Sequence, residues 1–142
     1  MTAIQQITED QEIVTESKLA HQTAVKILIV DDQDDIRHLY SKVIQKCGHY
    51  NAGSLCDGEE VVGEFEKNPH AADIIIMDQR MPRMDGVVAS RKIKEINPKV
   101  KIIMVTSYDD VKKEDRELFE SYLLKPVSIN DLKGAIERSA LQ

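Results

Sequence analysis

Six side chains that can act as metal ligands, nucleophiles or hydrogen-bond donors stand directly after short apolar runs: Asp31, Asp32, Asp78, Thr106, Ser107 and Lys125. Three carboxylates in one place repel one another, so they either raise one another's pKa values or bind a cation. Oxygen ligands of this kind favour Mg²⁺, which keeps several waters and takes one or two carboxylates. Any one of these residues could be only the polar end of a buried strand, but four strands that all end in such residues indicate a shared site.

The strand that leads into Asp78 is the clearest element of the sequence. Residues 74–77 are three isoleucines and a methionine without a polar break. A short, unbroken run rich in β-branched residues predicts a strand that is buried on both faces. Because an unpaired buried carboxylate is costly, we expect Asp78 where the strand surfaces, at its carboxyl end. Ligands bind at that end in open parallel α/β sheets.

Segments of strand character alternate with segments of helical character along the chain. The strands are expected at residues 26–30, 50–55, 73–78, 101–106 and 122–124. This alternation predicts an α/β protein with right-handed crossovers and helices on both faces of a parallel five-stranded sheet. The expected fold is the three-layer, flavodoxin-like (βα)5 arrangement with strand order 2-1-3-4-5. That order places the first and third strands side by side and brings Asp31, Asp32 and Asp78 together.

The expected helices differ in how firmly they are anchored. The segment 36–47 has apolar residues at spacings of three and four, and Asp34 or Asp35 should be its N-cap. Its inward face should consist of Ile36, Leu39, Tyr40, Val43, Ile44 and Cys47. The last helix should turn Ile129, Leu132 and Ile136 inward. The segment 111–120 has few apolar positions, so we expect a helix that is thinly anchored and mobile.

Composition limits the class of protein. The chain has 142 residues, of which 42% are hydrophobic and 31% are charged, and its net charge is −6. These values predict one soluble domain and argue against a nucleic-acid-binding protein, because no dense basic patch exists. No apolar run is long enough for a membrane helix, and the N-terminus has neither the basic start nor the apolar centre of a signal peptide. We therefore expect a cytoplasmic protein.

Residues 1–24 differ in character from the rest of the chain. They are polar and are expected to form a flexible N-terminal extension, with a partner-binding segment as the alternative. Residues 25–142 are expected to form the folded domain. Its two cysteines, Cys47 and Cys56, form no metal-binding or disulfide pattern and are interpreted as small packing residues.

The ordered set of motifs resembles the receiver domain of two-component response regulators, the CheY-like family, over about residues 25–142. The residues that carry the resemblance are Asp31-Asp32, Asp78, Met81-Pro82, Met84-Asp85-Gly86, Thr106, Tyr122 and Lys125-Pro126. The resemblance implies a stand-alone, single-domain response regulator that accepts a phosphoryl group on Asp78. It implies no enzymatic activity on other molecules, because such a domain promotes only its own phosphorylation and dephosphorylation.

The resemblance also implies a role for each residue of the site. Mg²⁺ would be held by Asp32, Asp78 and the backbone carbonyl of Arg80, with Asp31 helping through water. Lys125 and Thr106 would contact the phosphoryl oxygens. Thr106 and Tyr122 would switch the face formed by the helix at 111–120, the strand at 122–124 and the last helix. Arg80 and Tyr108 would line the access of water, and two bulky side chains there lead us to expect slow autodephosphorylation.

The expected partners are a sensor histidine kinase or a histidine phosphotransfer protein as donor and a target protein downstream, without nucleic acid or membrane. The protein would be a monomer or a phosphorylation-dependent dimer. An alternative is a phosphorelay intermediate that passes the phosphoryl group on to a histidine phosphotransfer protein. A more distant alternative is a flavodoxin-like small-molecule binder or a phosphatase. A flavin phosphate site would need a Ser/Thr/Gly-rich loop where residues 31–35 are mostly acidic, and a phosphatase would need an acid where Arg80 stands.

Overall fold

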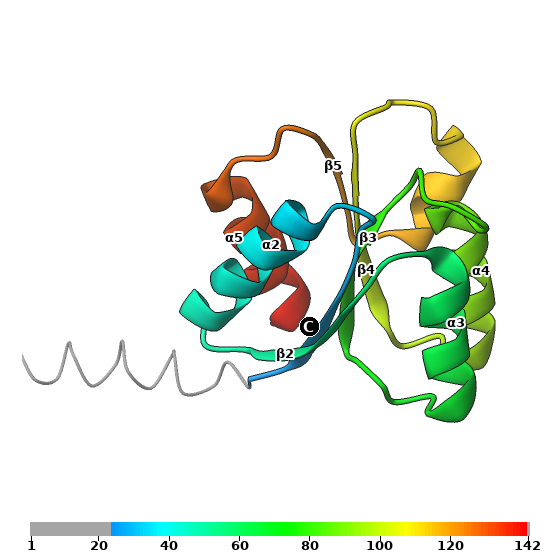
Figure 1. Ribbon diagram of the computed structural model, residues 1–142, viewed down its shortest axis with the longest axis horizontal. Helices are drawn as coiled ribbons and strands as arrows, with labels where there is room; N and C mark the ends of the chain where they lie inside the picture. The colour runs from blue at the N-terminus through cyan, green and yellow to red at the C-terminus, as the bar shows by residue number, and fades with distance from the viewer. Residues whose placement is uncertain (1–23, 142) are drawn as a thin grey trace, which may run out of the picture.

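The computed structural model of the protein describes residues 24–141 (Figure 1). The N-terminal extension expected over residues 1–24 therefore falls almost wholly outside the described residues, as does residue 142. Strands and helical segments alternate in the order β1 (Lys26–Val30), α2 (Asp34–Lys46), β2 (Tyr50–Leu55), α3 (Gly58–Lys67), β3 (Ile74–Asp78), α4 (Gly86–Ile96), β4 (Lys101–Thr106), η1 (Lys113–Leu118), β5 (Ser121–Leu124) and α5 (Ile129–Ala140). Within residues 24–141, no helix combines the length and the apolar character needed to cross a membrane.

The strands form one parallel sheet in the order β2-β1-β3-β4-β5, which confirms the predicted topology. In the register, Val30 of β1 lies beside Met77 of β3, and Thr106 of β4 lies beside Leu124 of β5. Every residue of β3 is buried, as expected for a central strand covered on both faces. The register brings the residues after β1 and β3 to the same edge of the sheet.

Helices cover both faces of the sheet. Figure 1 shows α2 and α5 on one side and α3 and α4 on the other. Alternate strand residues supply the two cores: Leu28, Ile75 and Met104 pack toward α3 and α4. Ile27, Ile76 and Ile103 pack toward α2 and α5. This three-layer arrangement holds the sheet rigidly, so the loops at its carboxyl edge start from fixed positions.

Side-chain caps begin three of the helices. Asp57 accepts a hydrogen bond from the Glu60 N–H at the start of α3, and Ser128 caps α5 in the same way. The predicted cap of α2 is wrong, because the N-cap is Gln33 and its side chain makes no capping bond. Asp34 and Asp35 lie instead in the first turn, where their charges interact favourably with the helix dipole.

Several burial predictions are also wrong. Leu39 is 41% exposed and Ile129 is 50% exposed, although both fit the apolar periodicity of their helices. The sheet covers a narrower stripe of α2 than its sequence offers, and Ile129 is the first residue of α5, at the end of the helix. Cys56 is exposed rather than packed. The third strand begins at Ile74, one residue later than predicted.

The segment 111–120 contains a short 3₁₀ helix, η1, rather than the expected α-helix. None of the residues of η1 is buried. Val111, just before it, is buried, and Leu118 and Phe119 are partly buried against the core. A segment with so few apolar residues cannot bury one side of a longer helix, so only a short 3₁₀ helix forms there.

Candidate functional site

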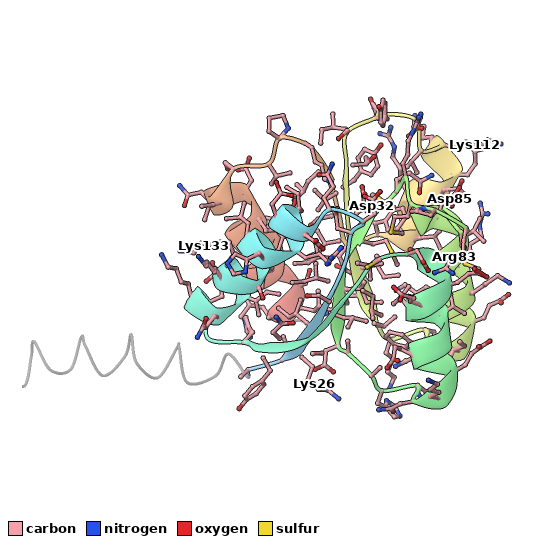
Figure 2. All side chains as sticks on the ribbon, viewed as in Figure 1. Lys26, Asp32, Arg83, Asp85, Lys112 and Lys133 are labelled. Carbon is pink, nitrogen blue, oxygen red and sulfur yellow. The ribbon has the colours of Figure 1, made fainter. Side chains whose placement is uncertain are left out.

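Three carboxylates meet at the carboxyl edge of the sheet. Asp31 and Asp32 follow β1, Asp78 ends β3, and each offers an oxygen that lies within 4.8 Å of the others. Asp31 and Asp78 are buried, whereas Asp32 is exposed and lies near the end of β3 in Figure 2. Among residues 24–141, this is the one group of three or more potential ligands close enough to share an ion.

Lys125 is the cation that accompanies these carboxylates. Its Nζ lies 2.8 Å from Oδ2 of Asp31 and 3.5 Å from Oδ1 of Asp78. The lysine is positioned by its backbone N–H, which donates to the carbonyl of Thr106 at 2.7 Å, and a cis peptide bond joins it to Pro126. Burial lowers the pKa of Lys125, but its hydrogen bond to Asp31 and the two carboxylate charges outweigh this effect and raise it. The side chain therefore remains an ammonium.

The two buried carboxylates, Asp31 and Asp78, differ in how many of their oxygens already accept hydrogen bonds from the protein. Oδ1 of Asp31 accepts the Gln33 N–H at 3.0 Å, and its Oδ2 accepts from Lys125. Both oxygens of Asp31 are thus engaged by protein groups. Oxygens of Asp32 and Asp78 remain available for a cation, and hard carboxylate oxygens are the donors that Mg²⁺ prefers. The donor set fits Mg²⁺.

Asp78 has a strongly perturbed pKa. Burial and the charge of Asp31 raise it from 3.8 to about 6, against the opposing charge of Lys125. The Gln79 N–H donates to Oδ1 of Asp78 at 3.0 Å and favours the ionised form. A carboxylate that is costly to ionise in this way is stabilised by any cation that binds beside it. The site therefore favours a divalent cation electrostatically.

A cavity of about 200 Å³ opens above Asp78. Its walls are formed by Asp32, Gln33, Asp78, Arg80, Thr106, Ser107, Tyr108 and Lys125. Thr106 is fully buried at the end of β4, and its Oγ1 accepts the Tyr108 N–H at 3.3 Å. The predicted site residues thus converge on this cavity, except Asp31, which is paired with Lys125, and Tyr122, which lies in β5 before the carboxyl end of the strand.

Arg80 and Tyr108 form one wall of the cavity together. The Arg80 guanidinium carbon lies 3.7 Å from the centre of the Tyr108 ring, and its Nη2 lies 2.6 Å from Oδ2 of Asp110. The sequence carries no signal for this role of Asp110, because the pair joins residues 30 positions apart. Asp110 and Tyr108 together hold the Arg80 side chain over one side of the site.

Tyr122 lies in a separate network. Its hydroxyl donates to Oδ1 of Asp109 at 3.2 Å, and the guanidinium of Arg116 stacks on its ring at 4.4 Å. Asp109 is also paired with Arg116. The loop after β4 is therefore held on one side by Arg80 and on the other by Arg116 and Tyr122.

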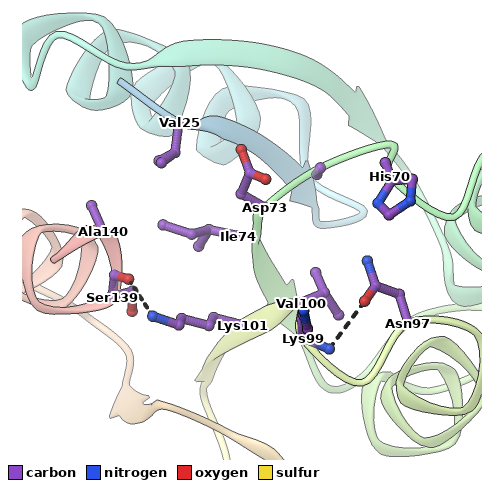
Figure 3. A pocket seen from close by; sticks show the side chains of 11 residues that line it. Val25, His70, Asp73, Ile74, Asn97, Lys99, Val100, Lys101, Ser139 and Ala140 are labelled. Atoms are coloured by element: carbon purple, nitrogen blue, oxygen red, sulfur yellow. Dashed lines mark hydrogen bonds between the residues drawn. The ribbon is translucent and has the colours of Figure 1, made fainter. Parts of the chain in front are cut away.

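A second cavity, of about 300 Å³, lies at the opposite, amino-terminal edge of the sheet (Figure 3). Its one carboxylate, Asp73, accepts the backbone N–H of Lys26 at 2.9 Å. Nζ of Lys101 donates to the Ser139 carbonyl at 2.9 Å. This cavity has no group of convergent carboxylates, so the chemistry of the described residues lies at the carboxyl edge.

The match to a known family agrees with this geometry. Residues 27–137 match the profile of the response regulator receiver domain. The chain therefore belongs to the family of receiver domains of two-component response regulators, in which phosphorylation and Mg²⁺ binding are general.

Two curated relatives illustrate the range of the family. Sporulation initiation phosphotransferase F of Bacillus subtilis is 31% identical over 116 residues, which cover 80% of this chain and 91% of that protein. The transcriptional regulatory protein PdtaR of Mycobacterium tuberculosis is 36% identical over 114 residues, or 79% of this chain and 55% of that protein. The chain thus spans about half the length of several curated relatives that it matches.

Solved structures have the same fold. A receiver domain protein from Clostridium thermocellum matches with a TM-score of 0.72 and 29% identity, over 83% of this chain and 94% of that one. The response regulator TrrA of Thermotoga maritima, solved in complex with Mg²⁺ and BeF, matches with a TM-score of 0.71 and 26% identity, over 80% and 97% of the two chains.

Proposed function

We propose that Asp78 accepts a phosphoryl group from a phosphohistidine of a partner protein, with Mg²⁺ as cofactor. The observation that carries this proposal is the placement of the Asp78 carboxylate in an open cavity, beside the Lys125 ammonium at 3.5 Å and the free carboxylate of Asp32. This arrangement suits a nucleophile that must approach a negatively charged group. The Lys125 ammonium on one side and Mg²⁺ beside Asp32 on the other would offset the repulsion between the two.

In the proposed reaction, an oxygen of Asp78 attacks phosphorus and forms a new O–P bond. The P–N bond to the donor imidazole breaks, its electron pair stays on the imidazole nitrogen, and that nitrogen takes up a proton. The product is an acyl phosphate on Asp78. No nucleotide is required at this site, because the phosphoryl group arrives already activated on the donor.

Each neighbouring side chain has a separate task in this proposal. Mg²⁺, held by Asp32, Asp78 and the carbonyl of Arg80, would supply positive charge for the phosphoryl oxygens. The Lys125 ammonium would hold a phosphoryl oxygen, and Asp31 keeps this ammonium in place through the 2.8 Å hydrogen bond. The Thr106 hydroxyl would donate to another phosphoryl oxygen. The energetic contribution of the protein is therefore mainly positioning and charge neutralisation.

The donor would be a sensor histidine kinase or a histidine phosphotransfer protein. An apolar groove of about 400 Å³ lies beside the site and shares Ser107 and Lys125 with its edge. The exposed side chain of Leu39 lines this groove together with Pro126 and Val127. A partner that brings a phosphohistidine to Asp78 would cover the groove and with it the exposed side chains of Leu39 and Pro126.

The proposed output is a change in the face formed by η1, β5 and α5. Phosphorylation adds about −1.5 to −2 charges beside Thr106, which would move toward the phosphoryl group, and Tyr122 would then turn inward. The altered face would bind a target protein. We propose the phosphorelay role as the second candidate, because a relative named as a phosphotransferase matches over 91% of its own length. In either role, the protein would act catalytically only on its own phosphorylation.

The test is the intact mass of the protein after incubation with a small phosphodonor and Mg²⁺. The proposal requires the gain of one phosphoryl group, which is lost in Asp78→Asn and in the presence of EDTA. The matched control is Asp85→Asn, which changes an aspartate in the same loop but preserves the N-cap of α4, since Asn caps helices well. A phosphoryl group that persists in Asp78→Asn, or none on the wild type, would refute the proposal.

A further inference from the structure

The loop between β3 and α4, residues 79–85, is attached to the start of α3 by an ion pair. Nε of Arg83 donates to Oδ2 of Asp57 at 3.0 Å, and Nη2 of Arg83 donates to the same oxygen. Oδ1 of Asp57 accepts the Glu60 N–H at 2.9 Å and caps α3. Figure 2 shows Arg83 next to the beginning of α3. A single buried carboxylate thus holds both the helix and the loop.

Asp57 and Arg83 each occupy a position that is unfavourable without the other. The Asp57 side chain is only 4% exposed. Burial raises its pKa, but the hydrogen bond from Arg83 and those from the α3 backbone outweigh this effect and lower it, so it stays ionised. Arg83 has a φ of +69°, in the left-handed region that residues other than glycine rarely adopt. The ion pair therefore holds the loop in a backbone conformation that it would not otherwise favour.

Close backbone packing supports the ion pair. A Cβ on Gly58 would lie 2.5 Å from the Met84 carbonyl oxygen, so the loop rests directly on the first residue of α3. At the base of the loop, the Gly86 N–H donates to the Gln79 carbonyl at 2.8 Å. The ends of the loop are joined to each other, and its outer part is held against α3. Little freedom remains for the residues between them, including Arg80.

We propose that Asp57 is a positioning residue for the Mg²⁺ site: together with Arg83 it fixes the loop whose Arg80 carbonyl is the expected backbone ligand. Asp57 contacts neither the metal nor the phosphoryl group. Outer-shell groups of this kind determine how well ligands are oriented before the ion binds. The inference rests on the proposed function, because it assigns a role to Asp57 at the same site.

The experiment compares Mg²⁺ affinity in three variants of the full chain. Asp57→Asn preserves the cap of α3 but removes the charge of the pair. Arg83→Gln leaves the cap untouched, and Gly58→Ala displaces Met84 without any change in charge. The control is Arg91→Gln, which removes an arginine of similar exposure that is paired with Asp115, away from the loop. Mg²⁺ dissociation constants come from amide chemical-shift titrations, and thermal midpoints and the Mg²⁺ dependence of phosphorylation by a small donor are measured alongside.

We expect the Mg²⁺ dissociation constant to rise about tenfold in each of the three variants, the lower end of the range for outer-shell changes, and to stay unchanged in Arg91→Gln. The phosphorylation rate should return to the wild-type value at saturating Mg²⁺. The double variant of Asp57 and Arg83 should have a Mg²⁺ dissociation constant no higher than that of the single variant that binds Mg²⁺ more weakly. The reason is that the two residues act as one unit.

Three outcomes would overturn the inference. The first is an unchanged Mg²⁺ affinity in Asp57→Asn and Arg83→Gln. The second is a lower thermal midpoint without a change in Mg²⁺ affinity, which would leave the pair a purely structural role. The third is a wild-type protein that binds no Mg²⁺, which would also refute the proposed function. A wild type that binds Mg²⁺ but takes up no phosphoryl group refutes the proposed function alone, and the affinities still decide the inference.

Discussion

Replacing Asp78 by Asn should make the Mg²⁺-free protein more stable. The Asp78 carboxylate is buried beside Asp31, and its pKa is raised from 3.8 to about 6. In the unfolded chain it ionises near 3.8, so at neutral pH the folded protein holds a charge that is costly in its surroundings. Each pH unit of this difference corresponds to about 1.4 kcal/mol, or about 3 kcal/mol in total. Water reaches the open side of the site and screens the charge, so we expect about 2 kcal/mol.

The pH dependence identifies the cause of this stabilisation. Because the folded state binds the proton more tightly than the unfolded state, the wild type loses stability as the pH rises from 3.8 to about 6. The advantage of Asp78→Asn should therefore be complete above pH 6 and disappear near pH 4. Asp131→Asn, which removes one carboxylate at an exposed position on α5, is the matched control.

The assay is thermal or urea unfolding in EDTA at several pH values. A gain of about 2 kcal/mol corresponds to a rise of about 8 °C in the midpoint for a domain of this size. Addition of Mg²⁺ should stabilise the wild type more than the variant, because the ion needs the charge that Asn lacks. The reasoning is refuted if the variant is no more stable at pH 8, or if its gain is the same at pH 4, which would indicate packing rather than charge.

Three further predictions concern other parts of the site. Arg80→Ala should speed the loss of the phosphoryl group from Asp78 by a factor of a few, because it removes one wall of the cavity; an unchanged decay of the phosphorylated mass, with Arg91→Ala as control, would contradict this. Gly86→Ala should lower the unfolding free energy by about 1–3 kcal/mol, because a Cβ there would lie 2.2 Å from the Asp78 carbonyl oxygen; an unchanged urea midpoint would count against it. Lys125→Met should cost about 3 kcal/mol at pH 8, because it leaves the two buried carboxylates without their cation. It should cost less near pH 4, where Asp78 is protonated, and an equal loss at both pH values in urea unfolding would exclude that cause.

Much of the fold could be predicted from local pattern. Uninterrupted β-branched runs identified the buried strands, and their alternation with helical segments led to the sheet order that the structure has. The carboxyl ends of those strands located Asp31, Asp78, Thr106 and Lys125 in one region. Periodicity was less reliable at element ends and surfaces, as the exposed Leu39 shows. A helical pattern states which residues share a face, but not how wide a stripe the neighbouring layer covers.

The sequence alone determined the order of the elements and, except at η1, whether each is a strand or a helix, because strand and helix periodicity depend on residues that are close in sequence. Only the tertiary structure decided which oppositely charged side chains form ion pairs. Lys125 pairs with Asp31, 94 positions away, and Arg83 pairs with Asp57, 26 positions away. Such pairs depend on where the folded sheet and its loops bring side chains together, and no pattern of neighbouring residues encodes that placement. The tertiary structure also decided the form of η1. Its residues form a short 3₁₀ helix because too few of them are apolar to bury one side of a longer helix against the core.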